Sequence, residues 1–147
     1  MVTQTQFAVI FCYTVIIILL GILSYTDAKK RILSNRIIGI LPVFVILMSF
    51  LKYGTIFIVP AFFAFIIGFI LFLLKVVGGG DVKLVSVLML SIPYEQILYF
   101  FFFTTLFGLL IIIIGWLLYR QSIRNDGLPY GIAISLGFMM TSLLFSV

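Results

Sequence analysis

Acidic side chains carry the chemistry that this 147-residue chain can perform, because it has no histidine and a single cysteine, Cys12. Without histidine the chain cannot build a histidine-dependent zinc or haem site or a Ser–His–Asp triad, and with one cysteine it cannot build a thiolate cluster or an internal disulfide. Cys12 lies in an apolar stretch with no histidine to activate it, so we expect a buried core residue. The remaining candidates are four carboxylates: Asp27, Asp81, Glu95 and Asp126.

Two of these carboxylates are predicted to lie at one depth. Asp27 follows the first long apolar stretch, and Asp81 precedes a later one. Aspartates that meet can share a proton, because like charges at close range raise one pKa and leave the other low. One carboxyl group then acts as an acid and the other as a base. This chemistry needs no metal and no cofactor, and we expect neither.

A glycine run, residues 78–80 of "KVVGGGDVKLV", stands directly before Asp81. Because glycine adopts backbone conformations closed to other residues, we predict an irregular loop here, along which an extended peptide could pair and present a bond to Asp81. Simpler interpretations stay open. Asp81 could be only a helix N-cap, Asp27 could only balance the basic residues beside it, and the glycines could form only a tight loop.

Composition predicts a membrane protein. Hydrophobic residues make up 65% of the chain, and nine basic and four acidic residues are its only charged ones. A soluble domain of this size could not cover such a sequence with polar surface. We predict one all-α transmembrane domain over residues 1–147, a bundle of about six helices. The predicted membrane segments are 7–25, 37–52, 55–75, 82–93, 97–119 and 130–146.

The basic residues predict the topology. Eight of the nine lie in the first, third and fifth breaks between segments, and only Lys52 lies in another break. The positive-inside rule therefore puts the odd breaks in the cytoplasm and both termini outside. We interpret the basic residues as topology signals and contacts with anionic membrane lipids, not as a nucleic-acid surface. The first segment lacks the basic start of a cleaved signal peptide. Asp126 is predicted to be a turn residue, and Glu95 a solvated residue of a short outer loop.

Three stretches resemble one known family, the type IV prepilin peptidases, which are GxGD aspartyl membrane proteases. "GGGDVKL", 78–84, resembles the family's G-x-G-D-x-K-L element. "DAKKRILSN", 27–35, resembles its first element, an aspartate followed by basic residues and Ile-Pro-Asn. "LPYGIAISLG", 128–137, resembles its late Pro-(Phe/Tyr)-Gly element. The resemblance covers residues 20 to 140 and implies a GxGD-protease-like helix bundle.

The resemblance implies a function and a site. It makes Asp27 and Asp81 the catalytic pair of an aspartic endopeptidase in the inner membrane. The implied substrates are prepilin or pseudopilin precursors, cleaved at the cytoplasmic face between a short basic leader and the hydrophobic segment. The positions that would support the pair or bind substrate are Gly78, Gly79, Gly80, Lys83, Asn35, Pro129, Tyr130 and Gly131.

The chain departs from the family pattern in two places. Ser34 stands where proline is usual, and the chain lacks the insertion with paired cysteines that longer members carry. It therefore resembles the short branch that serves Flp/Tad-type pilins, and N-methylation of the pilin is not expected. Two other functions stay open: a small ion-coupled transporter with a broken helix at residues 78–80, and a non-catalytic membrane subunit.

Overall fold

Helices make up nearly all of the computed structural model, which describes residues 2–146. Within these residues there is no β-strand. The elements are α1 (Val2–Lys30), α2 (Asn35–Tyr53), α3 (Ile58–Leu73), α4 (Gly79–Met89), the 3-10 helix η1 (Tyr94–Gln96), α5 (Ile97–Leu118), α6 (Arg120–Asp126) and α7 (Tyr130–Leu144).

Each of the six predicted apolar segments coincides with a helix, but several boundaries differ. The fourth helix, α4, begins at Gly79, inside the glycine run that we predicted to be a loop. The short helix α6 lies in the predicted fifth break. α6 ends at Asp126, and Gly127 follows it with a φ of 81°. The prediction that Asp126 is a turn residue is therefore wrong, because Asp126 is the last residue of α6 and the chain leaves the helix at Gly127.

The prediction of six membrane-spanning helices is not confirmed. Among the described residues, three stretches are long and apolar enough to cross a membrane: Thr3–Lys30, Asn35–Tyr53 and Tyr94–Leu118. A fourth span results if α6 and α7, which are bent by 101° relative to each other, count as one. α4 has 11 residues. At 1.5 Å per residue it is about 17 Å long, whereas the hydrocarbon core of a bilayer is about 30 Å thick. The structure supports an all-α membrane protein whose fourth helix does not span by itself.

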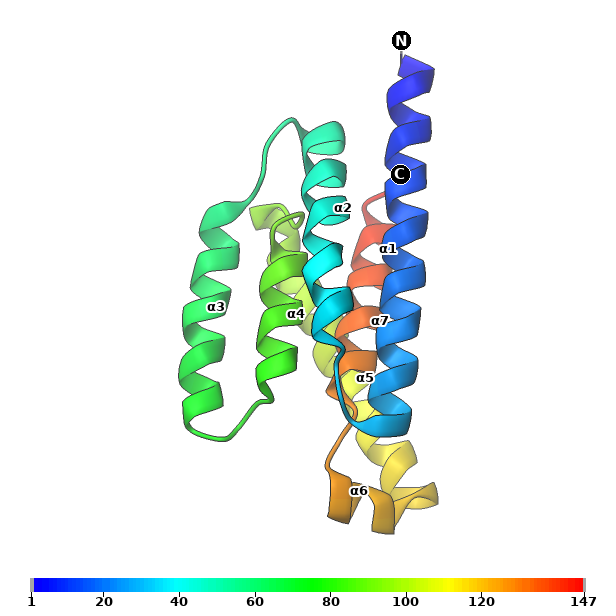
Figure 1. The fold of residues 1–147 in the computed structure, drawn as a ribbon, viewed down its shortest axis with the longest axis vertical. Helices are drawn as coiled ribbons and strands as arrows, with labels where there is room; N and C mark the ends of the chain where they lie inside the picture. The colour runs from blue at the N-terminus through cyan, green and yellow to red at the C-terminus, as the bar shows by residue number, and fades with distance from the viewer. Residues whose placement is uncertain (1, 147) are drawn as a thin grey trace.

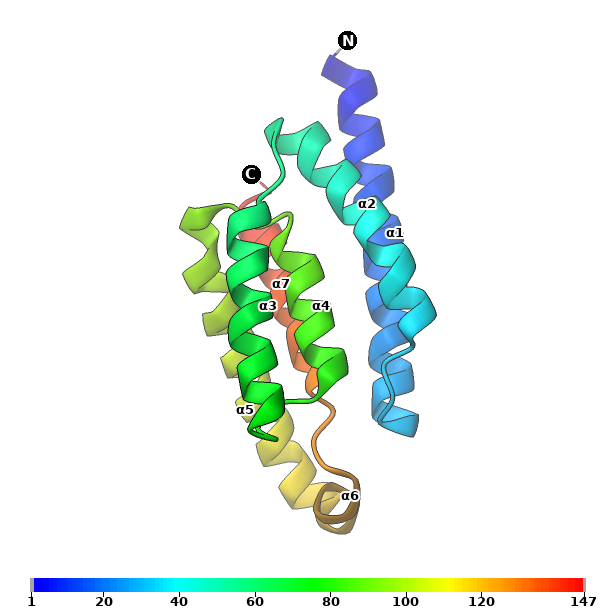
Figure 2. The same cartoon turned by 60° about the vertical axis from the view of Figure 1, so that its left-hand side comes forward.

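The helices run up and down the bundle as three packed pairs: α1 with α2, α3 with α4, and α5 with α7. Contacts of α1 with α7 and of α2 with α4 join the pairs, and Figure 2 shows α1 and α2 along one side of the bundle. In Figure 1 the α1–α2 connection, the α3–α4 connection and the segment between α6 and α7 all lie at the lower end. This end, which we call the motif end, carries all three sequence motifs. Both termini lie toward the other end. That the motif end faces the cytoplasm remains a prediction.

The core is apolar and lies between the pairs. Among its fully buried side chains are Leu20 of α1, Leu41 of α2, Leu88 of α4, Phe100 of α5 and Phe138 of α7. Outside this core, large apolar side chains cover the outer faces of α3 and α5, as expected where lipid replaces water. The prediction for Cys12 is confirmed, since only 2% of the residue is exposed.

Two glycines allow helices to approach closely. A Cβ on Gly68 of α3 would lie 2.7 Å from Cγ1 of Val82 on α4. A Cβ on Gly137 of α7 would lie 2.8 Å from the backbone nitrogen of Thr104 on α5. Small residues serve this purpose in membrane helix pairs, where close packing supplies much of the association energy. The Gly68 contact fixes α4, and therefore Asp81, against α3.

Candidate active site

Asp27 lies in the last turn of α1 and is 6% exposed. Its Oδ2 atom accepts a hydrogen bond of 2.8 Å from the backbone N–H of Gly131. Gly131 is the second residue of α7, and the first N–H groups of a helix have no partner inside it. The partial positive charge at this helix end favours a carboxylate. Asp27 therefore caps α7 from another helix, which ties the first sequence motif to the last.

Gly131 is glycine because the carboxylate comes so near. A Cβ at this position would lie 2.8 Å from Oδ2 of Asp27 and 3.0 Å from Cδ2 of Leu33. Any other side chain would push the carboxylate away from the helix end. Pro129, two residues before Gly131, is buried and stands at the N-cap position of α7. A proline with its fixed φ is suited to hold the chain in one entry direction.

Asp81 lies in the first turn of α4 and is partly buried. The N-cap residue of this helix is Gly78, so the interpretation of Asp81 as the N-cap is wrong. Instead the Asp81 carboxylate folds back and accepts a hydrogen bond from the Gly78 backbone. This is the arrangement of the third helical residue in a capping box. The contact holds the carboxylate at the motif end of α4.

The glycine run does not form the predicted irregular loop. Gly79 and Gly80 are helical, and Gly78 is extended with a φ of −72° and a ψ of 145°. None of the three has a positive φ. Glycine is therefore needed here because it is small, not because its backbone adopts conformations closed to other residues. A Cβ on Gly79 would lie 3.3 Å from the Phe72 ring, and one on Gly80 would lie 3.0 Å from Leu33. The expected room for close approach is present, but side chains of this chain occupy it.

Leu33 links the two aspartate-bearing regions. It belongs to the α1–α2 connection, and its side chain meets both Gly80 of α4 and Gly131 of α7. Asp27 is bonded to the second of these glycines, and Asp81 directly follows the first. This partly buried leucine therefore lies between Gly131, which donates to Asp27, and Gly80, which directly precedes Asp81. Sequence reasoning gave Leu33 no role, because an apolar residue in a short connection carries no chemical signal.

The two aspartates act on each other electrostatically. Burial raises the pKa of Asp81 to about 6, and the negative charge of Asp27 is the second cause of this rise. The hydrogen bond from Gly78 opposes it. Like charges brought together in a partly buried place disfavour double ionisation. The negative charge of Asp27 therefore disfavours ionisation of Asp81.

Other predicted positions also meet at the motif end. Lys83 Nζ donates a hydrogen bond of 3.4 Å to Oδ1 of Asn35, the first residue of α2. This exposed contact joins α4 to α2 beside the candidate pair. The hydroxyl group of Tyr130 instead lies against α5, where a Cβ on Gly108 would come within 3.1 Å of it. Tyr130 therefore contributes to helix packing.

Arg31 was interpreted as a topology signal, a lipid contact and one of the basic residues that Asp27 could balance, and the structure shows it beside the candidate site. It follows α1 in the left-handed region, with a φ of 55°, and its charge acts on Asp27. Its Nη1 atom is buried and has no hydrogen-bond partner within residues 2–146. A buried, unsatisfied guanidinium nitrogen is costly. Its position four residues after Asp27, one helical turn away, is the sequence signal that could have indicated the pairing.

Side chains that could bind a metal ion do not cluster in the described residues. Across the part of the chain that the structure describes, no three His, Cys, Asp or Glu residues lie together.

Comparison with known proteins decides the family. The model of the type IV leader peptidase family matches residues 14–113, about two thirds of the chain. The chain belongs to the type IV leader peptidase family. Membership confirms the resemblance seen in the sequence and implies a peptidase that acts on prepilin-type substrates. The matched region contains Asp27, Asp81, Asn35 and Lys83, and it ends before the Pro-Tyr-Gly motif. No curated protein and no solved structure matches the chain significantly.

Proposed function

We propose that this leader peptidase family member is an aspartic endopeptidase with Asp27 and Asp81 as its catalytic pair. Its substrate would be a prepilin or pseudopilin precursor, cut between its basic leader and its hydrophobic segment at the cytoplasmic face of the inner membrane. One observation carries the proposal. Two electrostatically coupled carboxylates lie at the same end of the bundle, on helices that the family match includes.

The surroundings of the two carboxylates suggest their roles. Asp81, with its pKa raised to about 6, holds a proton below that pH. Asp27 accepts the N–H of Gly131, a bond that favours an ionised carboxylate. Asp27 is therefore proposed as the base and Asp81 as the acid.

The reaction follows from these roles. Asp27 takes a proton from water, and the water oxygen attacks the carbonyl carbon of the scissile bond. In the tetrahedral intermediate the C–N bond breaks as Asp81 gives its proton to the leaving nitrogen. The proton now on Asp27 passes back to Asp81, and both groups regain their starting state.

Substrate recognition would rest on shape and apolar contact more than on charge. The motif end carries most of the basic residues of the chain, among them Arg31 and Lys83, and would repel a basic leader. Gly78 is exposed and extended, so an incoming peptide can approach the start of α4 there. Leu33 fills the space between the helix ends, so substrate entry requires its side chain to move.

A cleavage assay tests the proposal. The chain is expressed with candidate prepilins, and the mature N-terminus is determined by mass spectrometry for wild type, Asp27→Asn and Asp81→Asn. Asp126→Asn is the matched control, because Asp126 is exposed and ends α6 near the same end. We expect leader removal by wild type and the control, and a loss of more than about 100-fold in either test variant. Ordinary amounts of product from either test variant would defeat the proposal.

A transporter is the weaker candidate. An ion site in such a protein is expected near the middle of the bilayer, at a broken helix. Here the aspartates lie at helix ends, and the glycine run continues into α4 without a break. A non-catalytic subunit is tested by the same assay, since it predicts no cleavage by the wild-type chain.

A further inference from the structure

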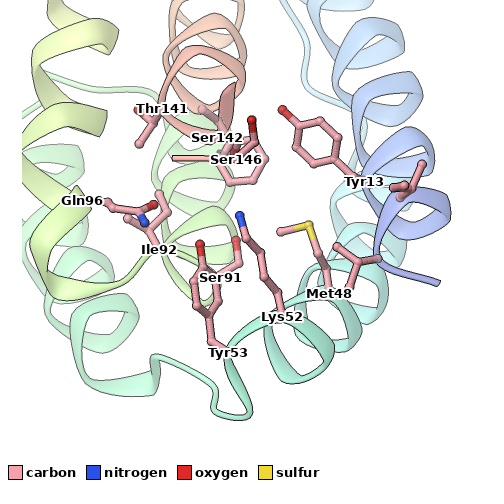
Figure 3. Close-up of a pocket in the computed structure, with 13 residues that line it drawn as sticks. Tyr13, Met48, Lys52, Tyr53, Ser91, Ile92, Gln96, Thr141, Ser142 and Ser146 are labelled. Carbon is pink, nitrogen blue, oxygen red and sulfur yellow. The ribbon is translucent and has the colours of Figure 1, made fainter. Parts of the chain in front are cut away.

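A cavity of about 200 Å³ lies at the end of the bundle away from the three motifs. It is bordered by α1 and α2 on one side and by the segment after α4, η1 and α7 on the other. None of its lining residues belongs to the sequence motifs, so it is separate from the candidate active site. Figure 3 shows polar side chains from several elements around it.

Lys52 supplies a positive charge to this cavity. It lies in the last turn of α2, and in Figure 3 its ammonium group points into the space between the helices. The Nζ atom lies 5.1 Å from the centre of the Tyr53 ring. Within residues 2–146 Lys52 forms no ion pair, and the nearby acid of the sequence, Glu95, does not line the cavity. The charge is therefore available to an anion.

Hydrogen-bond donors surround the same space. The Tyr13 hydroxyl is buried and lies toward Ser142 without a hydrogen bond of good geometry. Gln96 lines the cavity too, and its side chain has no partner within the described residues. A buried hydroxyl without a partner costs free energy unless a ligand or water satisfies it. A cation and several donors around one space match the oxygens of a phosphate or carboxylate.

The rest of the lining is apolar. Met48, Ile92 and Phe138 form part of the wall. Large exposed apolar side chains, Phe7 and Phe11, stand nearby on the outer face of α1. A ligand that satisfies both parts has an anionic head and a hydrocarbon tail. A volume of about 200 Å³ is below the range of about 300–1,000 Å³ typical of small-molecule pockets, which suits a headgroup, with its acyl chains lying outside along the helices.

We propose that this cavity binds the phosphodiester headgroup of an anionic membrane phospholipid, with Lys52 and Tyr13 as its main contacts. The lipid would fill the space between the α1–α2 pair and α7 and so hold these elements together. Free phosphate offers the same head chemistry without the tail. The two sources differ in whether acyl chains contribute to binding.

Native mass spectrometry of the full chain in detergent tests the site. Phosphatidylglycerol and phosphatidylcholine with identical acyl chains are titrated against wild type, Lys52→Gln, Tyr13→Phe and Lys30→Gln. Lys30 is an exposed lysine at the motif end and serves as the charge-matched control. We expect one phosphatidylglycerol bound at least fivefold more tightly than phosphatidylcholine. Lys52→Gln should abolish this preference, Tyr13→Phe should weaken phosphatidylglycerol binding two- to threefold, and Lys30→Gln should leave it unchanged.

Other results would overturn the proposal. Equal binding of both lipids to wild type would show that the site does not select an anionic headgroup. Equal losses of binding in Lys52→Gln and Lys30→Gln would show only non-specific electrostatic attraction. Tyr13→Phe removes a single hydroxyl group, so its effect does not depend on a disrupted fold. In a competition arm, inorganic phosphate or glycerol 3-phosphate that displaced phosphatidylglycerol at equal concentration would identify free phosphate as the ligand, not a lipid.

Discussion

Asp27 Oδ2 lies 2.8 Å from the backbone nitrogen of Gly131, a hydrogen bond across 104 residues of sequence. It joins the last turn of α1 to the first turn of α7. Both partners gain, since a nearly buried carboxylate is satisfied and an orphan helix N–H finds an acceptor. The same bond fixes the orientation of the proposed catalytic base.

Gly131→Ala should therefore damage the site. Its Cβ would lie 2.8 Å from Asp27 Oδ2 and 3.0 Å from Leu33, so the carboxylate must move. We expect cleavage to fall by at least about tenfold, with a loss of stability of about 1–3 kcal/mol. Rates with a prepilin substrate and unfolding in denaturing detergent measure the two effects.

Gly39→Ala is the control for this change. Gly39 lies inside α2, and a Cβ there would meet nothing within 4 Å. Replacing glycine by alanine in a helix stabilises by about 0.5–1 kcal/mol. Unchanged or slightly higher stability with full activity is expected for Gly39→Ala. If Gly131→Ala behaves in the same way, the tie to Asp27 has no role in catalysis.

The sequence was sufficient to predict the meeting of the motifs but not their geometry. Alternating apolar segments placed Asp27, Asp81 and the Pro-Tyr-Gly motif at one end, because each crossing reverses direction. The bond from Gly131 to Asp27 depends on how α1 packs against α7, which no local pattern encodes. The positive φ of Arg31 is equally invisible to residue type, since glycine or asparagine is the usual residue there.

Cleavage should fall as the pH rises above about 6. The pKa of Asp81 is raised to about 6 by burial and by the charge of Asp27, and the proposed acid loses its proton above that value. Because the aspartates are coupled, the measured limb belongs to the pair. Rates of leader removal between pH 5 and 8, with single-turnover conditions to isolate chemistry, give the profile. A rate that stays flat up to pH 8 would exclude Asp81 as the acid.

The ionisation of Asp81 should also make the folding stability depend on pH, in a direction that its pKa shift fixes. The folded pKa of Asp81, about 6, is above the value of about 3.9 for an unfolded aspartate. The folded state therefore binds more protons between these values. The contribution of Asp81 to stability is fully present below pH 4 and is lost as the pH rises toward and through 6. The loss attributable to this group is about 3 kcal/mol. Asp81→Asn should remove this dependence, whereas Asp126→Asn should keep it, in unfolding measurements at pH 4, 6 and 8.

The glycine run shows where sequence reasoning failed and why. Three consecutive glycines favour a loop by propensity, yet Gly79 and Gly80 lie in the first turn of α4. Tertiary contacts decide the outcome, because the Phe72 ring and Leu33 need the space that side chains would fill. Local preference costs about 1 kcal/mol per glycine in a helix, an amount that packing readily offsets.

The α3–α4 contact offers a test of packing by a double-mutant cycle. Gly68→Ala would place a Cβ 2.7 Å from Cγ1 of Val82, and overpacking of this kind costs about 1–3 kcal/mol. Val82→Ala removes both γ-carbons, so the double variant should recover most of the loss caused by Gly68→Ala. Unfolding free energies of the four proteins give the coupling. Purely additive effects would show that the two residues do not meet.

Ser34→Pro should stabilise the protein. Ser34 is the N-cap residue of α2, with a φ of −63° and a ψ of 116°, and its side chain makes no capping hydrogen bond. Proline fixes φ near −65°, and the backbone N–H of Ser34 has no partner within residues 2–146, so the ring removes no hydrogen bond. Because proline restricts the unfolded chain, we expect a gain of about 0.4–1 kcal/mol without loss of cleavage. Ser34→Ala separates the loss of the hydroxyl group from the restriction of φ. It removes the hydroxyl group without fixing φ and should leave stability nearly unchanged. A destabilised Ser34→Pro variant would mean that the α1–α2 connection, and with it the position of Leu33, differs from the extended form described here.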